Sequence, residues 1–218
     1  MKIQNLRIDG LSSTYMPSDD ALLVFGHGAG ADYQHPHMTA IAEALQKRGI
    51  GTLRFNFPFM ESRKRRVDSR GVCLTTIAAA LTRARELAGT KPLLVGGHSF
   101  GGRMATHFSS DSRSTQHYGI SGVVCFSFPL HPANKPGTER ASHLPEINKP
   151  QLYLSGNRDK LANTQLLERT LAAIPKATLH WLETADHSFK ILVRTRRSTE
   201  GIYDEAARVA SEWLKSAC

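Results

Sequence analysis

The stretch that decides the fold is Val95-Gly96-Gly97-His98-Ser99-Phe100-Gly101-Gly102, which contains the pattern Gly-x-Ser-x-Gly. The apolar run Pro92 to Val95 before it predicts a buried strand, and Arg103 to Phe108 after it predicts a helix. At such a strand-to-helix turn the serine is strained, and glycines on either side remove side chains that would collide. The pattern therefore predicts that Ser99 is a nucleophile.

Apolar runs and helical patterns alternate on both sides of this stretch. Upstream, Ala21 to Phe25 and Ile50 to Phe57 predict strands, and Met38 to Leu45 between them has the spacing of an amphipathic helix. Further strands are expected at 3–8, 123–128, 151–155 and 177–182, further helices at 77–87, 161–174 and 202–216, and turns or loops at 16–20, 58–70 and 129–150. This alternation predicts a mostly parallel central sheet with helices on both faces, whose ligands bind at the carboxyl ends of the strands.

The composition is that of an ordinary globular protein. The chain has 218 residues, of which 40% are hydrophobic and 22% charged, and we expect a single domain over 1–218. No run approaches the roughly 18 to 20 apolar residues of a membrane helix, and Met1 to Gly10 lacks the apolar core of a signal peptide. We therefore expect a cytoplasmic location and no membrane contact. The cysteines are scattered and suggest neither disulfides nor a metal site.

The formal net charge is +9, and Arg63 to Arg66 and Arg194 to Arg197 are dense basic runs. A solvated surface, an anionic substrate or acidic partner, and nucleic acid are the alternatives, and no zinc-finger or RNA-binding signature supports nucleic acid. Both runs follow strands at their carboxyl ends. They suggest an electropositive rim for carboxylated or phosphorylated substrates, with Arg63, Arg66 and Arg194 as candidate contacts.

A serine nucleophile needs a histidine base, and the histidine needs an orienting carboxylate. His187 lies in the loop after the last expected strand, and Asp159 follows the strand before it. The order Ser99, Asp159, His187 is the order that a Gly-x-Ser-x-Gly elbow requires. Asp186 is an alternative orienter, but adjacent residues on an extended loop usually point apart, so Asp159 is favoured.

Four motifs in the same order resemble those of the α/β-hydrolase family: Gly26-His27-Gly28-Ala29, Gly97-His98-Ser99-Phe100-Gly101, Gly156-Asn157-Arg158-Asp159 and Asp186-His187-Ser188-Phe189. The resemblance covers nearly the whole chain from Ala21. It implies the α/β-hydrolase fold, with Ser99 as nucleophile, His187 as base and Asp159 as orienter. It also implies an oxyanion hole formed by the amides of Ala29 and Phe100, with Gly28 beside the substrate.

Two strings, Gly26-His27-Gly28-Ala29-Gly30-Ala31 and Arg54-Phe55-Asn56-Phe57-Pro58-Phe59-Met60, look like a compact dienelactone-hydrolase-like subgroup. Its eukaryotic relatives include a testis-expressed protein and a subunit of a chromatin acetyltransferase complex, so membership does not guarantee catalysis.

The activity expected is that of a serine hydrolase that forms an acyl-enzyme on Ser99 and needs no cofactor. The slot for a lid, Pro129 to Pro150, is short, which favours small esters, thioesters or lactones as substrates. The alternative is a catalytically retired hydrolase that binds an acidic partner. Dehalogenase or epoxide-hydrolase chemistry is disfavoured, because those relatives place an aspartate where this chain has Ser99. The sequence leaves the oligomeric state open.

Other chemistry is less well supported. Gly26 to Ala31 lacks the pattern Gly-x-Gly-x-x-Gly, and there is no Walker lysine, so a nucleotide site is disfavoured. His27 and His98, inside glycine-rich turns, are expected to be structural. Four further histidines lie in expected loops: His35, His37, His131 and His143. Their spacing is not that of metal ligands, so no metal is expected.

Overall fold

The computed structural model describes residues 3–217 and contains a central eight-stranded sheet. Its strands are β1 Gln4–Ile8, β2 Leu11–Met16, β3 Ala21–Gly26, β4 Ile50–Phe55, β5 Leu93–His98, β6 Ile120–Phe126, β7 Gln151–Gly156 and β8 Ala177–Leu182. Their order in the sheet is β1-β2-β4-β3-β5-β6-β7-β8. Only β2 runs antiparallel to its neighbours β1 and β4 among these strands, and all other pairs are parallel.

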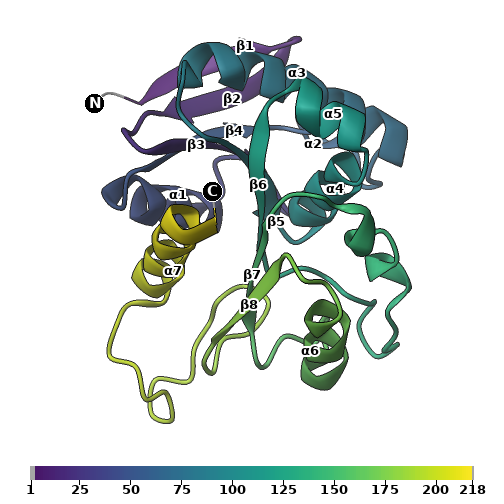
Figure 1. Cartoon of the computed structure of the whole chain (residues 1–218), viewed down its shortest axis with the longest axis vertical. Coiled ribbons are helices and arrows are strands. Elements are labelled where there is room, and N and C mark those ends of the chain that lie inside the picture. Colours follow the sequence, from purple (N-terminus) through teal and green to yellow (C-terminus); the bar gives the residue numbers. More distant parts are fainter. Residues whose placement is uncertain (1–2, 218) are drawn as a thin grey trace.

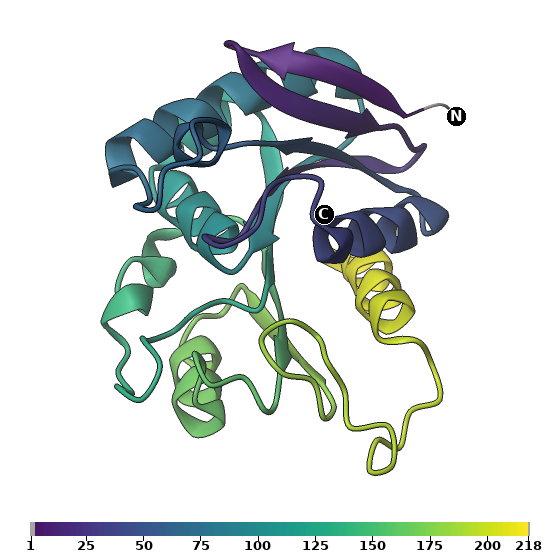
Figure 2. The same ribbon diagram turned by 180° about the vertical axis from the view of Figure 1, so that it is seen from behind.

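Helices cover both faces of the sheet. They are α1 Pro36–Lys47, α2 Pro58–Glu61, α3 Arg70–Ala88, α4 Phe100–Ser109, α5 Ser112–His117, α6 Thr164–Ala172 and α7 Ile202–Ala217, with short 3-10 turns η1 Glu139–Ala141 and η2 Leu144–Glu146. Helices α1 and α7 lie side by side on one face, and α3, α4 and α6 lie on the other (Figures 1 and 2). The expected α/β architecture, with a mostly parallel sheet and helices on both faces, is confirmed.

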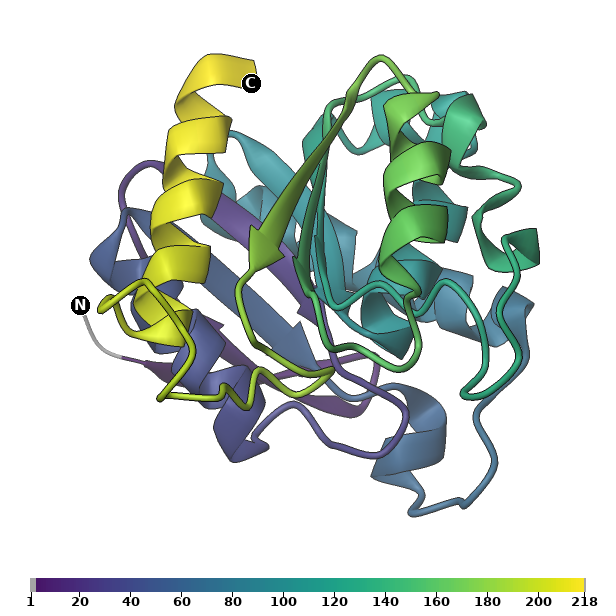
Figure 3. The same ribbon diagram turned by 90° about the horizontal axis from the view of Figure 1, so that it is seen from below.

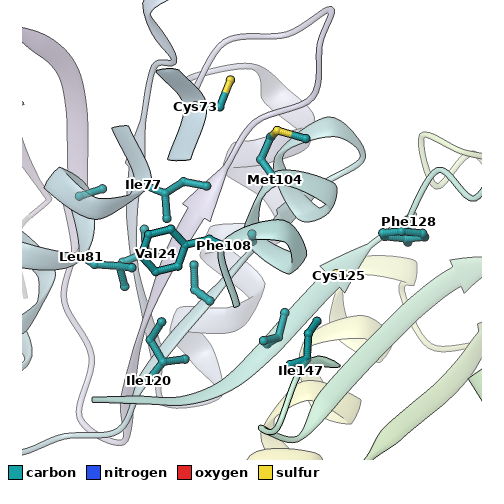
Figure 4. Close-up of a cluster of buried hydrophobic side chains, with 14 of the residues drawn as sticks. Val24, Cys73, Ile77, Leu81, Met104, Phe108, Ile120, Cys125, Phe128 and Ile147 are labelled. Carbon is teal, nitrogen blue, oxygen red and sulfur yellow. The ribbon is translucent and has the colours of Figure 1, made fainter. Parts of the chain in front are cut away.

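Two apolar layers hold the helices to the sheet. The layer beneath α3 and α4 contains Ile77, Met104 and Phe108, which converge on the central strands in Figure 4. The layer beneath α1 and α7 contains Met38 and Trp213. Burying an apolar side chain of this size stabilises the fold by about 1.5–3 kcal/mol. The central strands are buried on both faces, which explains why they are continuous apolar runs in the sequence.

The hairpin of β1 and β2 differs from the expectation, which placed a strand at 3–8, none at 11–16 and a turn beginning at Met16. Ser13 and Thr14 are polar but buried in β2, so that strand lacks an apolar pattern. The turn before it is Asp9-Gly10, with φ angles of 49° and 80°. Two positive φ angles in a two-residue turn suit a tight β-hairpin, and an Asp-Gly pair is a known sequence signal for one.

Smaller differences concern element ends and short helices. Strands β4 and β6 end at Phe55 and Phe126, two residues before the expected ends at 57 and 128. Helix α2 forms within the expected loop 58–70. Helix α5 was not expected, because its residues are polar and only Thr115 is buried; Asp111 caps it by accepting the Arg113 amide.

The segment 183–201 joins β8 to α7 and runs across the end of the sheet (Figure 3). Arg196 anchors it: this side chain is 2% exposed, forms an ion pair with Glu205 of α7 and donates to the Glu183 carbonyl at 3.0 Å. The basic run at 194–197 is therefore not wholly a surface feature, because one of its arginines is internal.

Among the helices of residues 3–217, none combines the length and the apolar character needed to cross a membrane.

Candidate active site

Ser99 stands at the turn between β5 and α4 in a strained backbone conformation. Its φ and ψ angles are 52° and −114°, and its amide donates to the Phe126 carbonyl at 2.9 Å. For a residue with a Cβ, such a backbone conformation costs on the order of 1–3 kcal/mol of stability. It persists only where the surrounding structure imposes it. The conformation places Ser99 among the residues that line a cavity at the carboxyl edge of the sheet.

The glycines of the pattern allow this turn because β3 lies against it. A Cβ on Gly97 would lie 2.5 Å from the Gly26 carbonyl oxygen, and a Cβ on Gly101 would lie 2.2 Å from the same oxygen. Neither distance is compatible with any side chain. The close approach of β3, β5 and α4 therefore explains why both positions are glycine.

A continuous chain of hydrogen bonds joins Ser99, His187 and Asp159. The Ser99 Oγ lies 2.8 Å from His187 Nε2, and His187 Nδ1 lies 2.7 Å from Asp159 Oδ2. The Asp159 side chain is wholly buried, and its other oxygen accepts the Leu161 amide at 2.7 Å. A carboxylate can only accept, so His187 donates through Nδ1 and its Nε2 is free to accept the serine proton.

Asp186, the alternative partner of His187, is engaged within its own loop. Its Oδ1 accepts the amides of Ser188 and Lys190 at 2.9 and 3.0 Å. The loop conformation therefore turns this carboxylate toward the backbone, and it is Asp159 that meets His187.

The amides proposed for an oxyanion hole, those of Ala29 and Phe100, are both available. Phe100 is the first residue of α4, where a helix has no internal acceptor for its amides. Neither amide donates to an acceptor within residues 3–217. Ala29 and Gly28 line the same cavity as Ser99. The positive end of the α4 dipole adds to the attraction of this corner for an anion.

Two buried histidines fasten the loops that carry these groups. His27 donates through Nδ1 to the Gly28 carbonyl at 2.7 Å and accepts the Phe57 amide at Nε2 at 3.0 Å. His98 donates through Nε2 to the His187 carbonyl at 2.9 Å. Burial lowers the pKa of His27 to about 4 and that of His98 to about 3. Both rings are therefore neutral near pH 7, and their hydrogen bonds hold the loops in place.

His37, considered from the sequence only as a loop histidine, also borders the cavity. Its Nδ1 lies 3.0 Å from the Tyr203 hydroxyl, and its buried Nε2 has no partner within the described chain. Burial lowers its pKa to about 4. No local sequence signal separates His37 from the other loop histidines, because its partner Tyr203 belongs to α7.

The cavity has a volume of about 310 Å³ and is lined by Gly28, Ala29, Gly30, Ala31, His35, His37, Met38, His98, Ser99, His187 and Ser188. The three arginines expected at its rim, Arg63, Arg66 and Arg194, are exposed and are absent from this lining. Within residues 3–217, no group of three or more histidine, cysteine, aspartate or glutamate side chains is arranged to hold a metal ion.

Comparison with known proteins shows which family the chain belongs to. A family model described as "Alpha/beta hydrolase domain" matches residues 19–215. The chain belongs to the α/β-hydrolase family. Membership in this family supports hydrolase activity. The elbow, the glycine-rich loop after β3 and the loop after β8 line the cavity, and the loop after β7 supplies Asp159 behind His187.

Solved structures resemble this α/β-hydrolase chain over nearly its full length. A dienelactone hydrolase from Anabaena variabilis matches with a TM-score of 0.70 at 20% identity, covering 99% of this chain and 97% of the other. A serine hydrolase without a lid from Xanthomonas campestris matches with a TM-score of 0.70 at 18% identity, covering 99% and 95%. The esterase domain of a Rhodothermus marinus protein matches with a TM-score of 0.70 at 16% identity, covering 99% of each chain. At these identities the likeness shows the fold.

Proposed function

We propose that this protein is a serine hydrolase that cleaves a small ester, thioester or lactone through an acyl-enzyme on Ser99. The observation that carries the proposal is the hydrogen-bonded chain from Asp159 through His187 to Ser99, set on a strained elbow. This arrangement activates a hydroxyl for attack on a carbonyl, because the serine is hydrogen-bonded to a base and the base is oriented by a carboxylate.

The proposed reaction begins with the Ser99 hydroxyl, which attacks the substrate carbonyl while its proton passes to His187 Nε2. Asp159 stabilises the resulting imidazolium without taking the proton itself. The amides of Ala29 and Phe100 bind the oxyanion, and removal of one such donor typically costs about 100-fold to 1,000-fold in rate. His187 then protonates the leaving group and activates the water that releases the acyl group.

The size of the cavity favours small substrates. A volume of about 310 Å³ lies at the lower end of the range for small-molecule sites. The segment between β6 and β7, where a lid would be inserted, contains only the short turns η1 and η2. The structural neighbours named as a dienelactone hydrolase and an esterase domain support lactones and esters as the classes to test.

The first test is labelling with a fluorophosphonate probe, which reacts only with activated serines. We expect the wild type to label, Ser99→Ala not to label, and His187→Ala to label at least about 1,000-fold more slowly, because the hydroxyl has lost its base. Ser188→Ala is the matched control. Ser188 lines the same cavity, but among the described residues no histidine is hydrogen-bonded to its hydroxyl, so its loss should leave labelling unchanged.

Failure of the folded wild type to label would contradict the proposal. It would favour the alternative in which the fold is catalytically retired and its net charge of +9 serves to bind an acidic partner.

A further inference from the structure

A second cavity lies beside α4 on the face of the sheet that carries α3. It has a volume of about 360 Å³ and shares no lining residue with the cavity at Ser99. Its walls come from the start of α3, from one face of α4 and from the turns η1 and η2: Arg70, Leu74, His107, Ser110, Ser142, His143 and Glu146.

One arginine lines this cavity, and two more lie near it. Arg70 lines it, and Arg103 precedes the lining residue His107 by one helical turn. Burial, and then the nearby Arg140 and Arg70, lower the pKa of Arg103. Within residues 3–217 none of the three arginines forms an ion pair, and the buried Nε of Arg103 has no hydrogen-bond partner. Guanidinium groups left unpaired together favour an anionic ligand.

A pair of stacked imidazoles forms another wall. The rings of His107 and His143 lie 3.6 Å apart at an angle of 18°. His143 Nε2 lies 2.9 Å from the Thr106 hydroxyl, whose own proton goes to the Arg103 carbonyl at 2.8 Å. His143 must therefore donate through Nε2 in its neutral form, which leaves a lone pair on Nδ1. That Nδ1 is buried without a partner, on a residue only 8% exposed.

We propose that this cavity, which is lined by Arg70 and has Arg103 and Arg140 close by, binds a phosphate group, either free or as a phosphate monoester. Arg70 supplies N–H donors at the cavity wall, and Arg103 and Arg140 add positive charge nearby. His143 Nδ1 needs a hydrogen-bond donor. Free hydrogen phosphate and a singly protonated monoester carry such an O–H group, whereas an ionised carboxylate does not. The single acid in the lining, Glu146, is exposed and forms no ion pair in the described chain, so it leaves the arginines free.

The site is independent of the proposed hydrolase activity. It has its own cavity, and binding there involves no bond cleavage. Ser99→Ala should therefore bind phosphate as the wild type does, so that loss of labelling at Ser99 and loss of phosphate binding are separate results.

The test is calorimetric titration of the full chain with inorganic phosphate, and with acetate at the same ionic strength. We expect phosphate to bind, acetate not to bind, and Arg70→Gln and Arg103→Gln each to weaken phosphate binding about tenfold or more. Arg83→Gln is the matched control: it removes the same charge from α3, roughly 20 Å along the helix from Arg70 and beyond the screening length.

Arg70 is exposed at the start of α3, so its variant tests the site even where Arg103→Gln impairs folding. Phosphate affinity within twofold of wild type in Arg70→Gln, or no phosphate binding at millimolar concentration, would overturn the proposal. A titration with phenyl phosphate then distinguishes the sources: tighter binding than inorganic phosphate identifies a monoester, and equal binding identifies the free ion.

Discussion

Ser99 holds a backbone conformation that its own Cβ opposes, and the close packing of Gly26, Gly97 and Gly101 around the turn keeps it there. The conformation is useful to the proposed chemistry because it brings the hydroxyl to His187. The strain should therefore lower the free energy of unfolding of any variant that keeps a Cβ at position 99, compared with one that has none.

We predict that Ser99→Gly is more stable than Ser99→Ala by about 1 kcal/mol, although neither should label with the probe. Alanine keeps the strained Cβ, whereas glycine adopts a φ of 52° without penalty. Elsewhere in a protein, glycine in place of alanine usually lowers stability. Urea denaturation of the pair measures the difference, and a less stable glycine variant would show that Ser99 is not under strain.

At the scale of elements, the segment 183–201 carries His187 and is held by a buried charge. Arg196 pairs with Glu205, which also lies 2.8 Å from His180 Nε2 of β8. Glu205 belongs to α7, so these contacts connect the segment, the last strand and the last helix.

We predict that Arg196→Met costs about 3–5 kcal/mol, because it leaves Glu205 buried without its cation. Arg194→Met, at an exposed position of the same segment, should change stability by less than about 0.5 kcal/mol. The free energy of unfolding in urea measures both variants. Replacing Glu205 by leucine in the Arg196→Met background should recover much of the loss, and equal effects of the two arginine variants would contradict the anchoring role.

The elements most accessible from the sequence are those whose pattern is local. The strands buried on both faces are continuous apolar runs, and the β5–α4 turn carries its glycines within a few residues. Strand β2 could not be read in this way, because its inner side chains Ser13 and Thr14 are polar. Arg196 looked like part of a surface charge run, since its partner Glu205 lies in the following helix and only folding brings the two together.

The whole molecule contains several histidines that stay neutral because they are buried, and this makes its stability depend on pH. The folded pKa values of His27 and His98, about 4 and about 3, lie below the ordinary value of 6.5. Between these values the unfolded chain binds more protons than the folded protein. The stability that these two residues contribute is therefore complete above about pH 6.5 and is lost as the pH falls.

We predict that the free energy of unfolding falls by about 1.4 kcal/mol for each of these two histidines between pH 7.5 and pH 5.5. Carboxylates remain ionised over this range, so they contribute little. Urea denaturation at the two pH values measures the fall, and His98→Gln, which keeps a side-chain donor, should make the fall smaller by about 1.4 kcal/mol. The same stability at both pH values would show that the rings are not buried in neutral form.

The three hydrogen-bonded residues follow three different strands: Ser99 follows β5, Asp159 follows β7, and His187 follows β8. A chain emerging from the ribosome therefore exposes the serine long before its histidine has been synthesised. Under the proposed mechanism, the hydroxyl has no base and stays unreactive until the last strand has docked. Probe labelling that appears during synthesis or refolding would consequently mark the moment at which β8 and the segment beyond it have folded. Labelling of this serine would therefore report completion of the sheet.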